Sequence, residues 1–284
     1  MTDKIRNLAV RTISGLILAI VTLVATWWSQ WSFGILLGLL AFGGIREFYD
    51  LARKHGADAQ EFIGLTAGMV LFVLNFTLVC NDLKVLEAGW VRDVFGLGMA
   101  FFLLLLPLVF FCELWRKKSN PAANIGVTFM SIIYVAVPFS LMCYFPILTT
   151  KEWSPEVMLG YIFVVWANDS FAYLVGMTLG RHKLFERISP KKSWEGFFGG
   201  LVGACITGMV IGYVLDASVL AWGGLAIVAS VTGVLGDLVE SMFKRAAEVK
   251  DSGELIPGHG GVLDRFDAML LSSPFVFVYM IFVM

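Results

Sequence analysis

The chain has 284 residues, of which 58% are hydrophobic and 15% are charged, and its mean hydropathy is +0.80. Soluble domains carry about 25% charged residues, so this composition excludes an ordinary soluble globular protein. The formal net charge is only −1, and we expect no nucleic-acid partner.

Long apolar runs follow one another along the whole chain. A membrane-spanning helix needs about 20 mostly apolar residues, and the sequence predicts about nine such helices. The first follows basic residues, as in a signal peptide, but it is long, lacks a clear cleavage site and soon meets a second span. We therefore interpret it as a transmembrane helix. The predicted spans are residues 8–27, 31–49, 62–80, 94–114, 125–148, 157–180, 196–215, 218–240 and 263–284.

The basic residues alternate between the two sides of these spans. Eighteen of the 21 Lys and Arg residues lie at the N-terminus and in every second connection, and only Lys84, Arg92 and Lys151 lie on the other side. The positive-inside rule then predicts an all-α, multi-pass protein of the cell (inner) membrane with an N-in, C-out topology and polar active-site loops on the cytoplasmic face. Residues 1–150 form the N-terminal membrane region and residues 151–284 the C-terminal catalytic region, in one continuous unit.

The first five spans carry little that topology does not explain. The run Arg116-Lys117-Lys118 needs no role beyond the positive-inside bias. The pair Arg46-Glu47, at the end of the second span, is interpreted as a snorkelling pair at the membrane interface.

The densest group of charges precedes and opens the last span. Asp264 and Asp267 are three residues apart at its head, so their side chains share one face. They suit a cation such as Mg²⁺, which takes one or two carboxylates plus substrate phosphates. The alternative is capping of the helix N-terminus. We favour metal or phosphate chemistry, because a His-Gly-Gly sequence precedes them and Arg265 lies between them.

Glycines surround His259 just before this helix. Gly258, Gly260 and Gly261 are explained either by a tight turn or by a phosphate cradle at a helix N-terminus. His259 fits a turn residue, a phosphate donor or an acid for a leaving group. We place it among the catalytic residues and favour a phosphate contact.

Two further spans contain carboxylates, which are costly inside a membrane and usually functional. Asp237 lies near the cytoplasmic end of the eighth span and is predicted to be a third metal ligand, with Glu240 as a weaker candidate. Pairing with a basic residue is the structural alternative. Asn168 and Asp169 lie about mid-span in the sixth and are predicted to line a polar cavity for a nucleotide or lipid headgroup.

The connection before the seventh span combines lysines with a helix start. Lys191 and Lys192 are placed to neutralise a triphosphate, and Ser193 either binds an anion or simply caps the helix. Glycines recur through the span that follows, from Gly196 to Gly212. They predict close helix packing, within the chain or between subunits.

Residues 241–267 resemble, without departure, the signature of the phosphatidate cytidylyltransferases, also called CDP-diacylglycerol synthases. The helix with Asn168-Asp169 and the connection 189–196 are similar to that family too. The likeness covers roughly residues 160–284, since the N-terminal half matches only in being hydrophobic and multi-spanning. The matching signature positions are Ser241, Phe243, Lys244, Arg245, Lys250, Asp251, Gly253, Ile256, Pro257, His259, Gly260, Gly261, Val262, Asp264, Arg265, Phe266 and Asp267.

The resemblance implies transfer of a cytidylyl group from CTP to phosphatidate at a bilayer surface, with Mg²⁺ and possibly a second cation, in a homodimer. It implies Asp237, Asp264 and Asp267 as metal ligands, and Lys244 and His259 beside them as catalytic residues. The expected substrate-binding residues are Asn168, Asp169, Lys191, Lys192, Ser193, Arg245, Lys250, Asp251, Gly260, Gly261 and Arg265.

Two other functions remain as alternatives. A CTP-dependent lipid kinase of the polyprenol or phytol type would use the same metal and basic groups and transfer the γ-phosphoryl group instead. An ion-coupled transporter would use Asp169, Asp237 and the lysines as a pathway. The concentration of charge at one face and the lack of an inverted repeat speak against transport.

Overall fold

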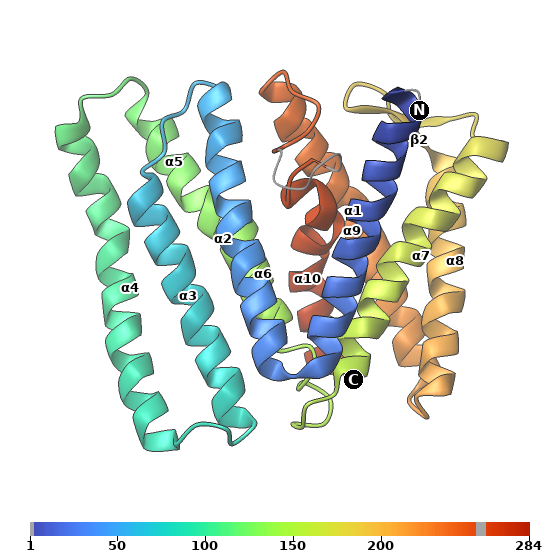
Figure 1. Ribbon diagram of the computed structural model, residues 1–284, viewed down its shortest axis with the longest axis horizontal. Helices are drawn as coiled ribbons and strands as arrows, with labels where there is room; N and C mark the ends of the chain where they lie inside the picture. Colours follow the sequence, from blue (N-terminus) through green and yellow to red (C-terminus); the bar gives the residue numbers. More distant parts are fainter. Residues whose placement is uncertain (1–2, 254–259) are drawn as a thin grey trace.

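The computed structural model describes residues 3–253 and 260–284, with side chains from Thr12 onward, and is almost entirely helical (Figure 1). A helix coincides with each predicted span. The helices are α1 Asp3–Trp28, α2 Gln30–Lys54, α3 Glu61–Asp82, α4 Ala88–Arg116, α5 Pro121–Ser131, the π-helix η1 Ile132–Ala136, α6 Val137–Met142, α7 Pro155–Leu179, α8 Trp194–Val214, α9 Val219–Ala246 and α10 Leu263–Val283.

The composition of these helices confirms an all-α integral membrane protein. Seven helical segments of the described chain are long and apolar enough to cross a membrane, with Pro121–Met142 running as one segment through α5, η1 and α6. The apolar part of α1, Thr12–Trp28, is shorter. Helix α2 is long enough to cross a membrane but carries several charged residues near its C-terminal end. The start of α1 lies at the upper edge of the molecule in the view of Figure 1, and the C-terminus lies at the lower edge.

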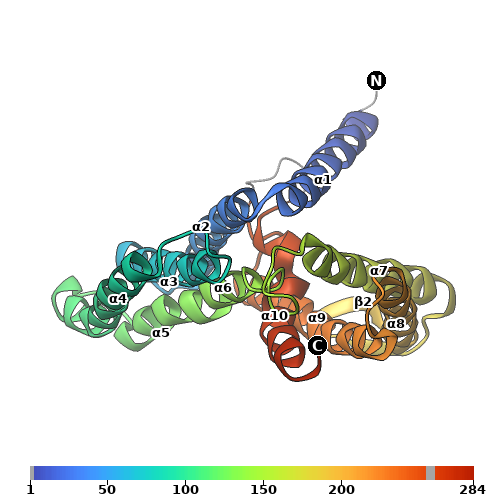
Figure 2. The same ribbon diagram turned by 90° about the horizontal axis from the view of Figure 1, so that it is seen from below.

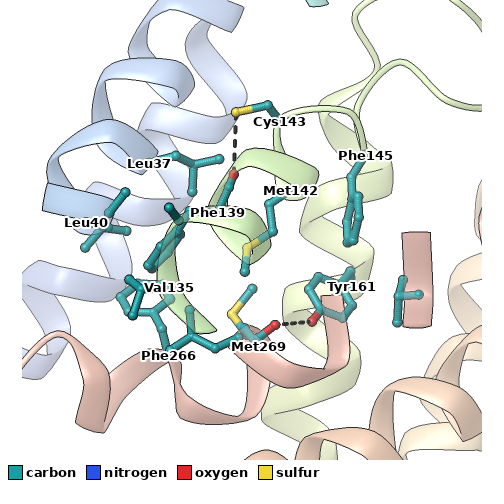
Figure 3. Packing of buried hydrophobic residues seen from close by; sticks show 14 of the residues in the cluster. Leu37, Leu40, Val135, Phe139, Met142, Cys143, Phe145, Tyr161, Phe266 and Met269 are labelled. Carbon is teal, nitrogen blue, oxygen red and sulfur yellow. Dashed lines mark hydrogen bonds between the residues drawn. The ribbon is translucent and has the colours of Figure 1, made fainter. Parts of the chain in front are cut away.

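The helices form two groups with α10 between them. Seen from below, α2 to α6 lie on one side, α7 to α9 on the other, and α1 extends away from both (Figure 2). One hydrophobic cluster joins the groups: Leu37 of α2, Phe139 of α6, Tyr161 of α7 and Met269 of α10 all belong to it (Figure 3). This packing holds α10, which carries the signature aspartates, against helices from both parts of the chain.

The glycines of α8 are covered within the chain. A side chain at Gly200 would meet Asn168 and Ala172 of α7, and one at Gly208 or Gly212 would meet Trp222 of α9. The close helix packing predicted from the glycines is therefore intramolecular. The helix instead exposes bulky residues such as Phe198.

The connection between α7 and α8, expected as a loop, contains a hairpin. Strand β1, Lys183–Phe185, pairs antiparallel with β2, Ser189–Ser193, so that Lys183 lies opposite Ser193. The hydroxyl of Ser193 accepts a hydrogen bond from the N–H of Gly196 at 3.2 Å. Ser193 thus caps α8, which was the structural alternative for this residue.

Arg116 does more than mark topology, contrary to the interpretation from sequence. Its guanidinium pairs with Asp58 at 2.9 Å and with the buried Glu113 at 2.8 Å, while Lys118 pairs with Asp58 at 2.8 Å. The hydrogen bond from Lys118 and the charge of Arg116 lower the pKa of Asp58, which lies outside the spans. These residues join the α2–α3 connection to the end of α4.

Candidate active site

Helices α9 and α10 bring three carboxylates together. Asp237 and Glu240 share one face of α9, and Asp267 lies in the first turns of α10. One oxygen from each lies within 4.8 Å of the other two. Glu240 is buried, whereas Asp237 and Asp267 are half-buried. We call these three residues the carboxylate cluster, and their oxygen ligands and spacing suit a hard divalent cation.

Asp264 lies one turn before Asp267, but its side chain is held elsewhere. Its Oδ2 atom accepts hydrogen bonds from the N–H of Ser252 and of Gly261, both at 2.8 Å, and from the Ser252 hydroxyl at 2.9 Å. Asp264 thus fastens the segment before α10 to the helix itself. In the part of the chain that the structure describes, the third carboxylate beside Asp237 and Asp267 is that of Glu240, whereas Asp264 was the third metal ligand expected from the sequence.

Lys244 connects the cluster to Asp264. Its ammonium lies 2.5 Å from Oε2 of Glu240 and 2.7 Å from Oδ1 of Asp264, and its side chain is only 14% exposed. Glu240 and Lys244 are four residues apart on α9, so one helix presents both charges to α10. A cation between two buried carboxylates offsets their repulsion and holds the two helices in register.

The sequence suggested that Glu47 is a snorkelling residue at the membrane interface, but the structure buries it. It is 7% exposed and accepts hydrogen bonds from the N–H groups of Val262 at 2.9 Å and Leu263 at 3.0 Å. The first N–H groups of a helix have no partner within it, and a negative charge there also complements the helix dipole. Glu47 of α2 therefore caps α10, even though the two are far apart in the sequence.

The glycines before α10 make room for these carboxylates. Gly260 has φ of +84°, and a Cβ atom there would lie 2.5 Å from Oδ2 of Asp264. A Cβ atom on Gly261 would collide with the Glu47 carboxylate. The N–H of Gly261 already donates to Asp264, so it serves the loop rather than standing open as part of a phosphate cradle.

Strand β2 places a lysine on the carboxylate cluster. The ammonium of Lys192 lies 2.5 Å from Oδ2 of Asp237, with both side chains partly exposed. The neighbouring Lys191 is exposed. The hairpin thus brings positive charge to the acidic ends of α9 and α10, which the sequence indicated only as a general steering effect.

Two cavities meet at Asp169 of α7 and Asp237 of α9, which line both. The first, about 410 Å³, lies between α7, the hairpin and α8 and includes Lys191 and Lys192. The second, about 520 Å³, lies between α1, α7 and α10. Its apolar wall comes from Gly15, Leu18, Ala19, Ile162, Val165 and Trp166, and its polar end from Asp264, Arg265 and Asp267.

The other predicted site residues lie around this centre. Asn168 is buried beside Asp169, to whose carboxylate its amide donates at 3.3 Å. Arg245, Lys250 and Asp251 are exposed at the end of α9 and just after it. His259 lies outside the described residues.

A family model described as "Cytidylyltransferase family" matches residues 9–283. The chain belongs to the cytidylyltransferase family. It is 33% identical over 293 residues to a protein of Haemophilus influenzae named phosphatidate cytidylyltransferase, an alignment that covers 96% of this chain and 99% of the relative. A protein of the same name from Bacillus subtilis is 33% identical over 273 residues, covering 94% and 95%. One from Staphylococcus saprophyticus is 32% identical over 248 residues, covering 86% and 90%.

These matches confirm the resemblance drawn from residues 241–267 and extend it to the N-terminal half, where no motif indicated it. Sequence reasoning missed two participants in this site. Glu47 was attributed to the interface, although a carboxylate near the end of an apolar span was itself a signal. Ser252, between signature residues Asp251 and Gly253, was passed over although it binds Asp264.

Proposed function

We propose that the protein transfers a cytidylyl group from CTP to phosphatidate, forming CDP-diacylglycerol and pyrophosphate for phospholipid biosynthesis. The observation that carries this proposal is the meeting of two cavities of different character at one carboxylate cluster, in a member of the cytidylyltransferase family. Relatives named phosphatidate cytidylyltransferase match almost the whole chain, which supports the same reaction here.

The linings of the cavities favour one substrate each. The cavity beside the hairpin contains Lys191 and Lys192, whose charges suit the triphosphate of CTP. The cavity walled by Leu18 and Ala19 of α1 is apolar along one side and charged at its end near Arg265. That gradient suits a lipid with a phosphate headgroup. Both substrates then present phosphates to each other at Asp169 and Asp237.

The reaction needs alignment more than acid–base chemistry. A phosphate monoester has a second pKa near ~6, so the lipid phosphate is largely dianionic at neutral pH and is already a nucleophile. Its oxygen attacks the α-phosphorus of CTP, and pyrophosphate leaves. The protein contributes by holding the two phosphates in line and by placing positive charge around the groups that gain negative charge.

The carboxylate cluster fits Mg²⁺, because three carboxylate oxygens converge there beside a polar cavity. Asp237, Glu240 and Asp267 would hold the ion, and the sequence adds Asp264 to this set. A bound divalent cation neutralises phosphate charge and polarises the phosphoryl oxygens. A second cation remains part of the proposal from family resemblance.

The lysines supply the remaining positive charge. Lys192 lies at the boundary between the nucleotide cavity and the cluster, where it reaches Asp237. Lys244 is buried between Glu240 and Asp264, so its role is to fix the carboxylates and the start of α10. Arg245 and Lys250 are exposed nearby and are proposed to meet the outer phosphates of the incoming nucleotide.

The proposed setting is the cell (inner) membrane, with the site facing the cytoplasm, where CTP is found. The hairpin, the start of α1 and the end of α9 all lie along the upper edge of the molecule in Figure 1, and the basic residues gather in the same connections. Phosphatidate would enter sideways from the inner leaflet. A homodimer is proposed from the family resemblance alone.

The deciding experiment supplies purified protein in lipid–detergent micelles with phosphatidate, Mg²⁺ and CTP radiolabelled at the α-phosphorus. Label should enter the lipid fraction, chelation should abolish this, and Asp267→Asn should reduce it at the Mg²⁺ concentration that saturates the wild type. A parallel reaction uses CTP labelled at the γ-phosphorus with a polyprenol or phytol acceptor. Lipid labelled only in that reaction would contradict cytidylyl transfer and identify a lipid kinase.

A further inference from the structure

The fifth span contains a tyrosine whose setting points to the active site. Tyr134 lies in the middle of the π-helix η1, Ile132–Ala136, and is only 5% exposed. Single π-helical turns inside membrane or soluble helices occur frequently at functional sites. No sequence motif in the N-terminal half indicates a role for Tyr134, and only its position in the fold points to one.

Two site-bearing helices hold the ring of Tyr134. Its centroid lies 5.6 Å from that of Phe48 on α2 and 5.4 Å from that of Phe243 on α9. Phe48 directly follows Glu47, and Phe243 directly precedes Lys244. The aromatic packing therefore fixes the Tyr134 ring against α2 and α9, the helices that carry Glu47 and Lys244.

The hydroxyl of Tyr134 has no hydrogen-bond partner within residues 3–253 and 260–284. Other buried tyrosines of the chain are paired: Tyr49 with Ser131 at 2.6 Å and Tyr161 with Ser272 at 2.5 Å. A buried hydroxyl without a partner destabilises the folded state. Phenylalanine would fill the same space without that cost, so packing alone does not explain a tyrosine here.

The ring of Tyr134 packs on Phe243 of α9, one turn after Glu240. Phe139, in the same helical segment as Tyr134, packs on Phe266 of α10, directly before Asp267. Tyr134 therefore lies where α9 and α10 bring the carboxylate cluster together. The hydroxyl thus adds a neutral donor from η1 to an otherwise acidic group. A phenol is a good donor to an anionic oxygen, and such hydrogen bonds are stronger than those between neutral groups.

We infer that Tyr134 is a substrate-binding residue, whose hydroxyl donates a hydrogen bond to a phosphate oxygen of a substrate seated at the carboxylate cluster. This rests on the proposed function, because CTP and phosphatidate both bring phosphates to that point. The bond gives the unpaired hydroxyl its partner only when substrate is present. It also makes the N-terminal half part of substrate recognition.

The test compares Tyr134→Phe with Tyr49→Phe, which removes a hydroxyl that is already paired. Without substrates, Tyr134→Phe should melt at the wild-type temperature or above, whereas Tyr49→Phe should melt lower. Titrations with CTP and with phosphatidate, read by thermal shift and by KM, then show which substrate the hydroxyl contacts. For that substrate, Tyr134→Phe should raise KM about tenfold or more and reduce the thermal shift, while Tyr49→Phe changes neither.

Unchanged KM values, kcat and thermal shifts in Tyr134→Phe would overturn the inference. A melting temperature below wild type without substrates would also overturn it, because the hydroxyl would then have a structural partner. Wild-type protein without cytidylyl transfer would contradict the proposed function itself. An active wild type with an unaffected Tyr134→Phe variant would contradict only the assignment of Tyr134.

Discussion

Glu47 and Leu263 are joined by a hydrogen bond of 3.0 Å, from the backbone N–H of Leu263 to Oε2 of the glutamate. A side chain of α2 thus caps the N-terminus of α10, whose first turns carry Asp264 and Asp267. Because Glu47 is buried and also accepts from Val262, a shift of α2 would move the start of α10. The N-terminal region therefore helps to set the geometry of the carboxylates.

Replacing Glu47 by glutamine should lower activity more than its small change in volume suggests. One carboxylate oxygen becomes an NH₂ group facing a backbone N–H, so a buried donor loses its acceptor, at a cost of about 1–3 kcal/mol. We expect reduced thermal stability and a kcat at least about tenfold lower in Glu47→Gln. The control is Glu61→Gln, because Glu61 forms an exposed ion pair with Arg53. A wild-type kcat in Glu47→Gln would contradict the positioning role.

Asp267→Asn and Asp264→Asn should differ in their response to magnesium. Asp267 belongs to the carboxylate cluster, whereas Asp264 is bound by Ser252, Gly261 and Lys244. We expect Asp267→Asn to raise the Mg²⁺ concentration needed for half-maximal activity by at least tenfold. Asp264→Asn should lower kcat and thermal stability with little change in that concentration. Equal shifts in both variants would make Asp264 a ligand, as the sequence predicted.

An alanine at Gly260 should disturb both the backbone and Asp264. The positive φ of +84° costs a residue with a Cβ atom about 1–2 kcal/mol. Gly56 offers a matched control, since it has φ of +87° but no atom within 4 Å of an added Cβ. We expect both variants to lose stability and only Gly260→Ala to lose most of its activity. Comparable activity in the two would show that the space beside Asp264 does not matter.

The pairing of Asp58 with Lys118 and Arg116 should give an acid-dependent contribution to stability. These partners lower the pKa of Asp58 in the folded state, so the contribution is present above the unfolded pKa of about 3.9. It is lost as pH falls through the lower folded value. The pair is partly exposed, so Asp58→Asn should cost only about 0.5–1 kcal/mol at pH ~7. Unfolding curves of variant and wild type should converge at acidic pH, and a difference that persists there would exclude the charge as its cause.

Local patterns predicted the spans well because each apolar run must form its own helix in a membrane. The same reasoning singled out Asp237 and Asp267, whose carboxylates stand out in apolar surroundings and lie together in the structure. It placed Glu240 below Asp264 as a candidate ligand, since both lie near the ends of helices and their surroundings in the sequence do not separate them. Only the contacts of Ser252 and Gly261 with Asp264 separate their places in the site.

The errors concern partners that are distant in the sequence. Glu47 was interpreted from its neighbours on α2, while its hydrogen-bond donors lie on and just before α10. The hairpin was missed because Lys183–Phe185 has only three residues and Ser189–Ser193 is polar, so neither shows the apolar alternation that indicates a strand. The structural role of Arg116 was missed for the same reason, because its partner Asp58 lies before α3 and far from it in the sequence.

In the ion pair between Lys192 and Asp237, the lysine ammonium neutralises a carboxylate of the candidate metal site. The metal ion proposed to bind at Asp237 would compete with that ammonium, and a displaced Lys192 would become available to the phosphates of the nucleotide. We expect each ligand therefore to favour the other, and thermodynamic reciprocity requires both affinities to rise by the same factor. Loading of the site would then be cooperative within a single chain.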